Sequence, residues 1–267
     1  PATLPAAQSP DGAVAPKQGV AQNFSAKRPA SRGPSEGIQV HGHWTIEVRN
    51  PDGKVVSHTE FENALSPGFS FPLPPNNGSS VQLPGGSAFL SALMTGEAVM
   101  TPENWAILLE GPGGLQGTSA PCTPVDNDEY YSSCFLFPSA ADNAFSGPIC
   151  TTVNASPSPG PNGYSCNLAV SPLGTGPNFT GFQLSGTVIA MQPGTVSAVV
   201  TMNFGVCGPT ESLANCPFAS SSVGFAAFTA RNLDGNTAAG AAAGDPNPVS
   251  VTAAGQTISV TVAVSFQ

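Results

Sequence analysis

Hydrophobic and polar residues alternate along several short stretches of the chain, which is the pattern of half-buried β-strands. In the clearest stretch, residues 38–49, one face carries Ile38, Val40, Trp44, Ile46 and Val48. The following segment, Asn50-Pro51-Asp52-Gly53, is a strong turn signal, because proline suits the second turn position and glycine tolerates a positive φ. A return strand over residues 54–61 completes a predicted β-hairpin.

A short helix is predicted over residues 87–94, with Ser87 as its N-cap and Gly96 as its stop. The apolar run of residues 105–109 reads as a buried strand. Residues 192–195 are predicted to form a hairpin loop, and the last strand is expected to lie at the centre of a sheet. Further strands are expected at roughly 131–137, 164–170, 180–191, 195–206, 222–231 and 257–266.

These short strands, divided by turn residues, are typical of an all-β protein, and we expect an Ig-like or jelly-roll-type β-sandwich with one short helix. The composition agrees with this class. The chain contains 30 Gly and 28 Pro, which favour turns over long helices, while a hydrophobic content of 40% supports a folded core.

Charge is scarce and mostly negative. Only 9% of the residues are charged, against roughly 25% in an average soluble domain, and the net charge is −9. Seven Lys and Arg residues are too few for a surface that binds phosphates, so we expect no nucleic-acid partner. No apolar stretch approaches the length of about 18 residues that a membrane span requires, so no membrane insertion is expected.

The first 36 residues are rich in Pro, Ala, Ser and Gln and have few large apolar side chains, so they are predicted to form an extended tail. Residues 37–267 form the predicted body, with a cysteine-rich loop region at about 120–220. We expect the tail to be ordered only by packing on something else, either its own domain or a neighbouring subunit. Its best candidate for a donor strand, residues 14–24, contains Val14, Val20 and Phe24.

The six cysteines are predicted to form three disulfides. No C-x-x-C pair or accompanying His favours zinc, and the spacing falls into three successive pairs around Pro/Gly/Asn/Ser-rich loops. Disulfides persist in oxidising compartments, which predicts an extracellular or cell-surface protein that has lost a signal peptide. The predicted pairs are Cys122 with Cys134, Cys150 with Cys166, and Cys207 with Cys216.

Metal sites have weak candidates. His41 and His43 share the polar face of the first strand, and His58 lies on the return strand. Solvent-facing polar residues are the simpler interpretation of these histidines. Calcium prefers oxygen ligands at alternate positions, but the acidic runs lack EF-hand spacing, and Asn-Asp-Gly runs are ordinary turn formers. The acidic candidates are Asp126, Asp128 and Glu129, and the run Asn232, Asp234 and Asn236.

Catalytic motifs are not evident. The sequence contains no G-x-S-x-G and no H-E-x-x-H, and its two Trp and three Tyr offer little for a sugar-binding platform. We expect no enzyme and no cofactor, although a carboxylate pair for glycoside hydrolysis is defined in space and not by spacing. Asn-x-Ser/Thr sequons make glycosylation a further hypothesis, at Asn23, Asn77, Asn154 and Asn178.

The segment GHWTIEVRNPDGKVVSHTEFENAL (residues 42–65), followed by FLSALM, NWAILL and the closing run at residues 254–262, resembles a module of phage tail and head fibre proteins and related secreted bacterial surface proteins. The resemblance covers residues 42–109 and the last strand. It implies an extracellular structural role and assigns no catalytic residue. The cysteine-rich middle departs from phage proteins that assemble in a reducing cytoplasm, and favours a secreted surface protein.

The sequence therefore predicts a structural subunit of an extracellular filament or surface assembly. In this hypothesis the tail of one subunit donates a strand to the next, so identical subunits form a homopolymer, with glycan as an additional partner. Two alternatives remain open at this point: a monomeric secreted adhesion or binding module, and a virion fibre or decoration protein.

Overall fold

The computed structural model describes residues 40–63, 65–66, 69–72, 80–83, 85–95, 102–112, 120–122, 133–138, 164–204, 225–235, 242–243 and 247–266. The chain divides into two units, Pro1–Gly37 and Ile38–Gln267. All of the described residues belong to the second unit, which we call the body. Val14, Val20 and Phe24, the predicted donor residues, lie outside the described residues.

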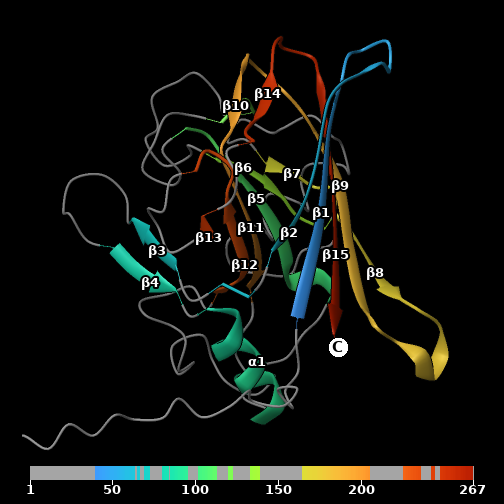
Figure 1. The fold of residues 1–267 in the computed structure, drawn as a ribbon, viewed down its shortest axis with the longest axis vertical. Coiled ribbons are helices and arrows are strands. Elements are labelled where there is room, and N and C mark those ends of the chain that lie inside the picture. Colours follow the sequence, from blue (N-terminus) through green and yellow to red (C-terminus); the bar gives the residue numbers. More distant parts are fainter. Residues whose placement is uncertain are drawn as a thin grey trace, which may run out of the picture. The chain divides into compact units, whose positions relative to one another are not determined.

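The body contains a five-stranded sheet, which we call sheet A (Figure 1). All of its neighbouring strands are antiparallel. The C-terminal strand β15 is the middle strand, as the sequence predicts, and it pairs with β1 and β9. The strand order is β2 (Val55–Asn63), β1 (Val40–Arg49), β15 (Thr257–Phe266), β9 (Gly181–Ile189) and β8 (Ala169–Leu173).

A six-stranded sheet, sheet B, makes the second layer. Its three longest strands, β12, β11 and β5, are antiparallel, while the two-residue strands β13 and β7 pair in parallel at its ends. The strand order is β13 (Ala242–Ala243), β12 (Phe225–Asn232), β11 (Ala198–Phe204), β5 (Trp105–Glu110), β6 (Ser133–Leu136) and β7 (Tyr164–Ser165).

Smaller elements complete the described body. Two short pairs of strands are antiparallel, namely β3 (Phe69–Pro72) with β4 (Ser80–Leu83) and β10 (Gly194–Val196) with β14 (Val249–Val251). The single α-helix among the described residues is α1 (Gly86–Thr95), and single 3₁₀ turns lie at η1 (Pro102–Asn104) and η3 (Gly176–Asn178). The fold is therefore all-β, as predicted, with one short helix in the described part.

Aromatic side chains join the two sheets and the helix in the core. The ring centroids of Trp105 on β5 and Phe182 on β9 are 4.6 Å apart, so sheet B contacts sheet A directly. Phe228 on β12 packs edge-on against Trp105 at 5.3 Å, and Phe89 of α1 lies 6.2 Å from Trp105. Each such aromatic pair adds about 0.5–1.5 kcal/mol beyond the burial of its area.

The predicted β1–β2 hairpin is confirmed. β1 and β2 pair antiparallel from Gly42 with Asn63 to Val48 with Ser57, and the turn is closed by a 2.8 Å bond from Gly53 N–H to Asn50 O. Gly53 has φ +84°, the left-handed conformation for which the turn needs glycine. The helix starts at Gly86, one residue earlier than predicted, so Ser87 lies within its first turn and is not the N-cap.

The predicted hairpin across residues 192–195 is wrong. β9 belongs to sheet A and pairs with β15 and β8, whereas β11 belongs to sheet B. Where the chain crosses between the sheets, Met191 and Gln192 both donate their N–H groups to Pro121 O, and β10 then pairs with β14. The strand predicted at 164–170 is also divided, into β7 and β8 in different sheets.

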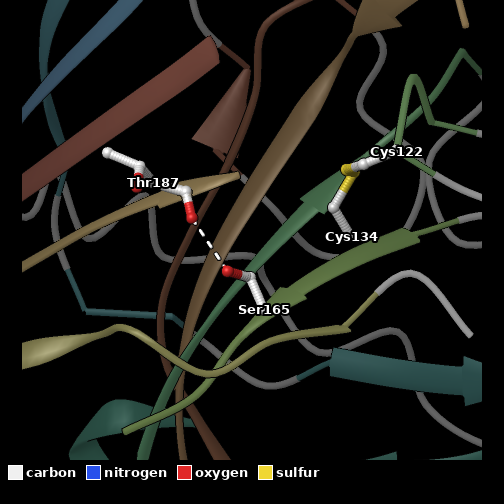
Figure 2. Close-up of a disulfide and its surroundings, with 4 residues drawn as sticks. All are labelled: Cys122, Cys134, Ser165 and Thr187. Atoms are coloured by element: carbon white, nitrogen blue, oxygen red, sulfur yellow. Dashed lines mark hydrogen bonds between the residues drawn. A yellow bond between two sulfur atoms is a disulfide. The ribbon is translucent and has the colours of Figure 1, made fainter. Parts of the chain in front are cut away.

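Cys122 and Cys134, the first pair that the spacing predicts, are joined by a disulfide with their Cα atoms 5.5 Å apart (Figure 2). Cys166 is also disulfide-bonded, and its partner lies outside the described residues. The same region is fastened across the core, where Ser165 on β7 donates a 2.9 Å hydrogen bond to Thr187 O on β9. Cys150, Cys207 and Cys216 lie outside the described residues.

Replacing both Cys122 and Cys134 by serine is expected to lower the free energy of unfolding by about 3 kcal/mol, because the bridge limits the unfolded chain. Urea denaturation of the oxidised protein measures the effect. Met94→Ser, on a side chain that is 76% exposed, is the control and is expected to change stability by less than about 0.5 kcal/mol. A loss below about 1 kcal/mol in the double variant contradicts the prediction.

Candidate functional site

The outer face of the β1–β2 hairpin collects histidines and carboxylates. The register places His43 opposite Glu62 and Glu47 opposite His58, with Glu60 opposite Thr45 between them. His43 Nδ1 lies 2.8 Å from Glu62 Oε1. His58 bridges two carboxylates, with Nδ1 3.2 Å from Glu47 and Nε2 3.2 Å from Glu60. We call this set, His43, Glu47, His58, Glu60 and Glu62, the His/Glu strip.

The strip lies at one side of sheet A. On the same outer face, β15 and β9 present only uncharged residues, namely Thr, Ser, Ala, Gln, Ile and Gly, so the titratable groups gather on β1 and β2. The hydrogen bond from Arg49 lowers the pKa of Glu47 below its usual value, and His58 acts in the same direction against the opposing effect of desolvation. Arg49 therefore holds one end of the strip in its ionised form.

Arg231 reaches from sheet B to the end of this hairpin. Its Nη1 donates a hydrogen bond to the backbone carbonyl of Glu62, and its guanidinium lies 5.1 Å from the centroid of the Phe61 ring. Phe61 in turn stacks on Trp44 at 5.8 Å. A guanidinium over an aromatic face is a favourable cation–π arrangement, so Arg231 ties β12 to the last residues of β2.

In the described part of the chain, several buried polar atoms of β1, β2 and Arg231 have no hydrogen-bond partner. They are both amide atoms of Asn63, the last residue of β2, together with Arg231 Nε and Trp44 Nε1. Asn63 is only 7% exposed and lies opposite Gly42, where a Cβ atom would collide with Asn63 Oδ1. Unpaired buried polar groups of this kind cost roughly 1–3 kcal/mol each.

Glu110 is a second unusual group. It ends β5, is only 1% exposed, and its Oε1 has no hydrogen-bond partner. Burial raises the pKa of Glu110 well above its usual value, because an apolar surrounding disfavours the charged carboxylate. The two residues that pair with Glu110 in sheet B are uncharged. They are Ser133 on β6 and Ala198 on β11. Glu110 is therefore a candidate for a neutral carboxylic acid at pH 7.

The three histidines do not meet at one point. His41 lies opposite Ser265 on β15, while His43 and His58 pair with carboxylates. Among the described residues, no group of three His, Cys, Asp or Glu side chains is arranged to hold a metal ion. In the other candidate run, Asn232 ends β12 and is buried, Asp234 is partly buried before the turn at Gly235, and Asn236 lies outside the described residues.

The remaining predicted residues divide between the described and the undescribed parts. Asn178 is exposed in η3, and Phe179 beside it is 62% exposed. The other predicted sites lie outside the described residues: Asp126, Asp128, Glu129, Asn23, Asn77 and Asn154.

The sequence reasoning missed Arg231 and Glu110. A signal for Arg231 was present, because it is the only Lys or Arg after Lys54. A lone cation in so long a stretch without another Lys or Arg indicates a specific partner. Glu110 follows the apolar run at residues 105–109 directly, but a carboxylate at a strand end is usually solvated, so only the fold reveals its burial.

Comparisons with known proteins assign no relative. No protein-family description, no curated protein and no solved structure matches the chain. No helix among the described residues is both long enough and apolar enough to cross a membrane. The site therefore has to be interpreted from its own geometry.

Glu110→Gln is expected to stabilise the body at pH 7 and to leave its stability unchanged near pH 4. Burial raises the pKa of Glu110 in the folded state, whereas the unfolded chain ionises Glu110 at its usual pKa, so stability falls as the pH rises from the usual pKa towards the raised pKa. Gln cannot ionise, so the variant avoids this loss. Each unit by which the pKa is raised, up to neutral pH, corresponds to about 1.4 kcal/mol in the free energy of unfolding. Urea denaturation at both pH values measures the difference, and equal stability of the two proteins at pH 7 contradicts it.

Proposed function

We propose that the protein is a structural subunit of an extracellular filament or surface assembly, and that it polymerises through its N-terminal segment. The observation that carries the proposal is the division of the chain into Pro1–Gly37 and the body. The buried core of the body, as far as it is described, extends from Val40 to Val264 and is drawn from both sheets and α1. In this proposal the preceding segment acts as the connector between subunits.

The sheet pairing supports an addition at an edge. β15 of the same chain fills the centre of sheet A between β1 and β9. A donated strand therefore does not replace a missing central strand, and adds to an outer strand instead. A head-to-tail contact of this kind is heterologous, so it does not close and generates a fibre.

The structural class supports the same proposal. The two facing sheets are interpreted as a β-sandwich of the Ig-like or jelly-roll type. Disulfide bonding at Cys122, Cys134 and Cys166 suits a protein that works outside the cell, and the resemblance to fibre and surface proteins falls on β1, β2, α1, β5 and β15. The same features suit a virion fibre protein, for which the assembly test is the same.

A monomeric adhesion or binding module is the alternative from a different class. The observation that favours it is the exposed tip between β8 and β9, where Phe179 is 62% exposed beside the sequon residue Asn178. An exposed aromatic side chain of this kind is a common anchor for a partner. In that case residues 1–37 only tether the module.

Deleting residues 1–37 is expected to abolish assembly while the body stays folded, because the connector is lost and the core is kept. Negative-stain microscopy and size-exclusion chromatography with light scattering compare the full chain with the deletion. A chain with residues 1–37 in scrambled order keeps length and charge and is the control for sequence-specific donation. Compact monomers from the full chain at all concentrations contradict the proposal and leave the binding module as the account.

A further inference from the structure

Charge is divided unequally between the two units of the chain. Four of the seven Lys and Arg residues lie within the first 37 positions, whereas fourteen of the sixteen Asp and Glu residues lie in the body. The N-terminal segment is therefore basic and the body strongly acidic. The basic residues of the segment are Lys17, Lys27, Arg28 and Arg32.

The acidic His/Glu strip borders an unshared strand edge. Among the described residues, β2 pairs with no strand other than β1 along Val55–Asn63. The corresponding edge of β12 is covered, since Ala227 bridges Gly85, Thr229 bridges Leu65, and Arg231 pairs with Ala242 of β13. β8, at the opposite edge of sheet A, contains Pro172, which has no N–H to donate. The edge of β2 is thus the long edge that accepts a further strand.

The direction of the Glu62 carbonyl identifies which backbone groups of β2 point towards the open edge, where an added strand would bind. Because this carbonyl accepts a hydrogen bond from Arg231, it points away from β1. Successive residues of a strand direct their backbone groups to alternate sides, so Glu60 and His58 present theirs to the same edge. These residues also carry exposed side chains of the strip, so an added strand meets hydrogen-bonding groups and carboxylates together.

Arg231 already occupies the end of this edge, because its guanidinium donates a hydrogen bond to the Glu62 carbonyl. Among the described residues, the part of the edge that is left for a further strand therefore lies before Glu62, where His58 and Glu60 are exposed.

We infer that the edge of β2 from His58 to Glu60, before the Glu62 carbonyl that Arg231 already occupies, is the acceptor for the basic N-terminal segment of a second copy of this chain, with Lys27 and Arg28 on the His/Glu strip. This inference rests on the proposed function and names its acceptor surface. The segment of the same chain runs towards Val40, at the Asn63 end of β2. If this segment paired with β2 of its own chain without reversing its direction, the two strands would be parallel. The segment of a second copy can pair with β2 in the antiparallel direction, which is more stable.

Carbodiimide cross-linking of the full-length chain tests the contact directly. Equal amounts of ¹⁴N- and ¹⁵N-labelled protein are mixed under assembly conditions, and amide cross-links between lysine and carboxylate are mapped by mass spectrometry. The expected result is a mixed-isotope link from Lys27 to Glu60 or Glu62. Links between these residues that carry one isotope only show a segment folded back on its own body and overturn the inference.

The same experiment separates the two proposals. If filaments form but the mixed-isotope links from Lys27 avoid β2, the acceptor is wrong and the structural function stands. If the full chain neither assembles nor gives mixed-isotope links, the proposed function fails and the inference fails with it.

Exchanging the charges of Glu60 and of Lys27 and Arg28 is an independent test of their predicted contact. Glu60→Lys is expected to raise the critical concentration for assembly about tenfold, because it sets like charges against each other. Asp52→Lys, in the exposed β1–β2 turn, makes the same change in charge away from the strip and is expected to have no effect. Adding Lys27→Glu and Arg28→Glu to Glu60→Lys is expected to restore assembly. Equal effects of Glu60→Lys and Asp52→Lys, or no restoration, contradict the inference.

Discussion

The packing of Trp105 against Phe182, Phe228 and Phe89 is the contact on which the rest of the body depends. Trp105 begins β5 of sheet B, Phe182 belongs to sheet A, and Phe89 belongs to α1, so one indole ring contacts elements of every layer. All four side chains are buried. Because protein cores are closely packed, a change in this cluster shifts the sheets relative to each other. The position of Arg231, three residues after Phe228, against the β1–β2 hairpin is a direct consequence of this packing.

The scarcity of charge gives each ionised group of the body a particular role. Arg231 joins β12 to the end of β2, and Arg49 lowers the pKa of Glu47, whereas burial raises the pKa of Glu110. Polar contacts elsewhere are made by amides and hydroxyls, as in the buried pair of Thr201 and Thr229, whose oxygens are 2.8 Å apart. Salt has little effect on such neutral hydrogen bonds, whereas it screens the interactions between the charged groups of the His/Glu strip.

Local chemistry explains how much of this structure the sequence predicts. The β1–β2 hairpin could be predicted from the sequence, because the alternation of apolar and polar residues and the turn at Gly53 lie within one short segment. Residues 192–195 are equally favourable for a turn, but β9 pairs with β15 and β8, and β11 pairs with β12 and β5. These partners are distant in the sequence, so no hairpin forms there. Histidines on an exposed strand were expected, while their pairing with Glu47 and Glu62 required the register. The burial of Glu110 and the reach of Arg231 depend on tertiary packing, which no local pattern contains.

The central position of β15 determines the order in which the body can form. Before residues 257–266 are in place, β1–β2 and β8–β9 are separate hairpins with nothing between them, since β15 supplies the ladder on both sides. The hairpins close locally and rapidly, whereas the pairing of β1 with β15 joins residues more than 200 positions apart. Sheet A therefore has no continuous ladder from β2 to β8 until β15 has joined the two hairpins.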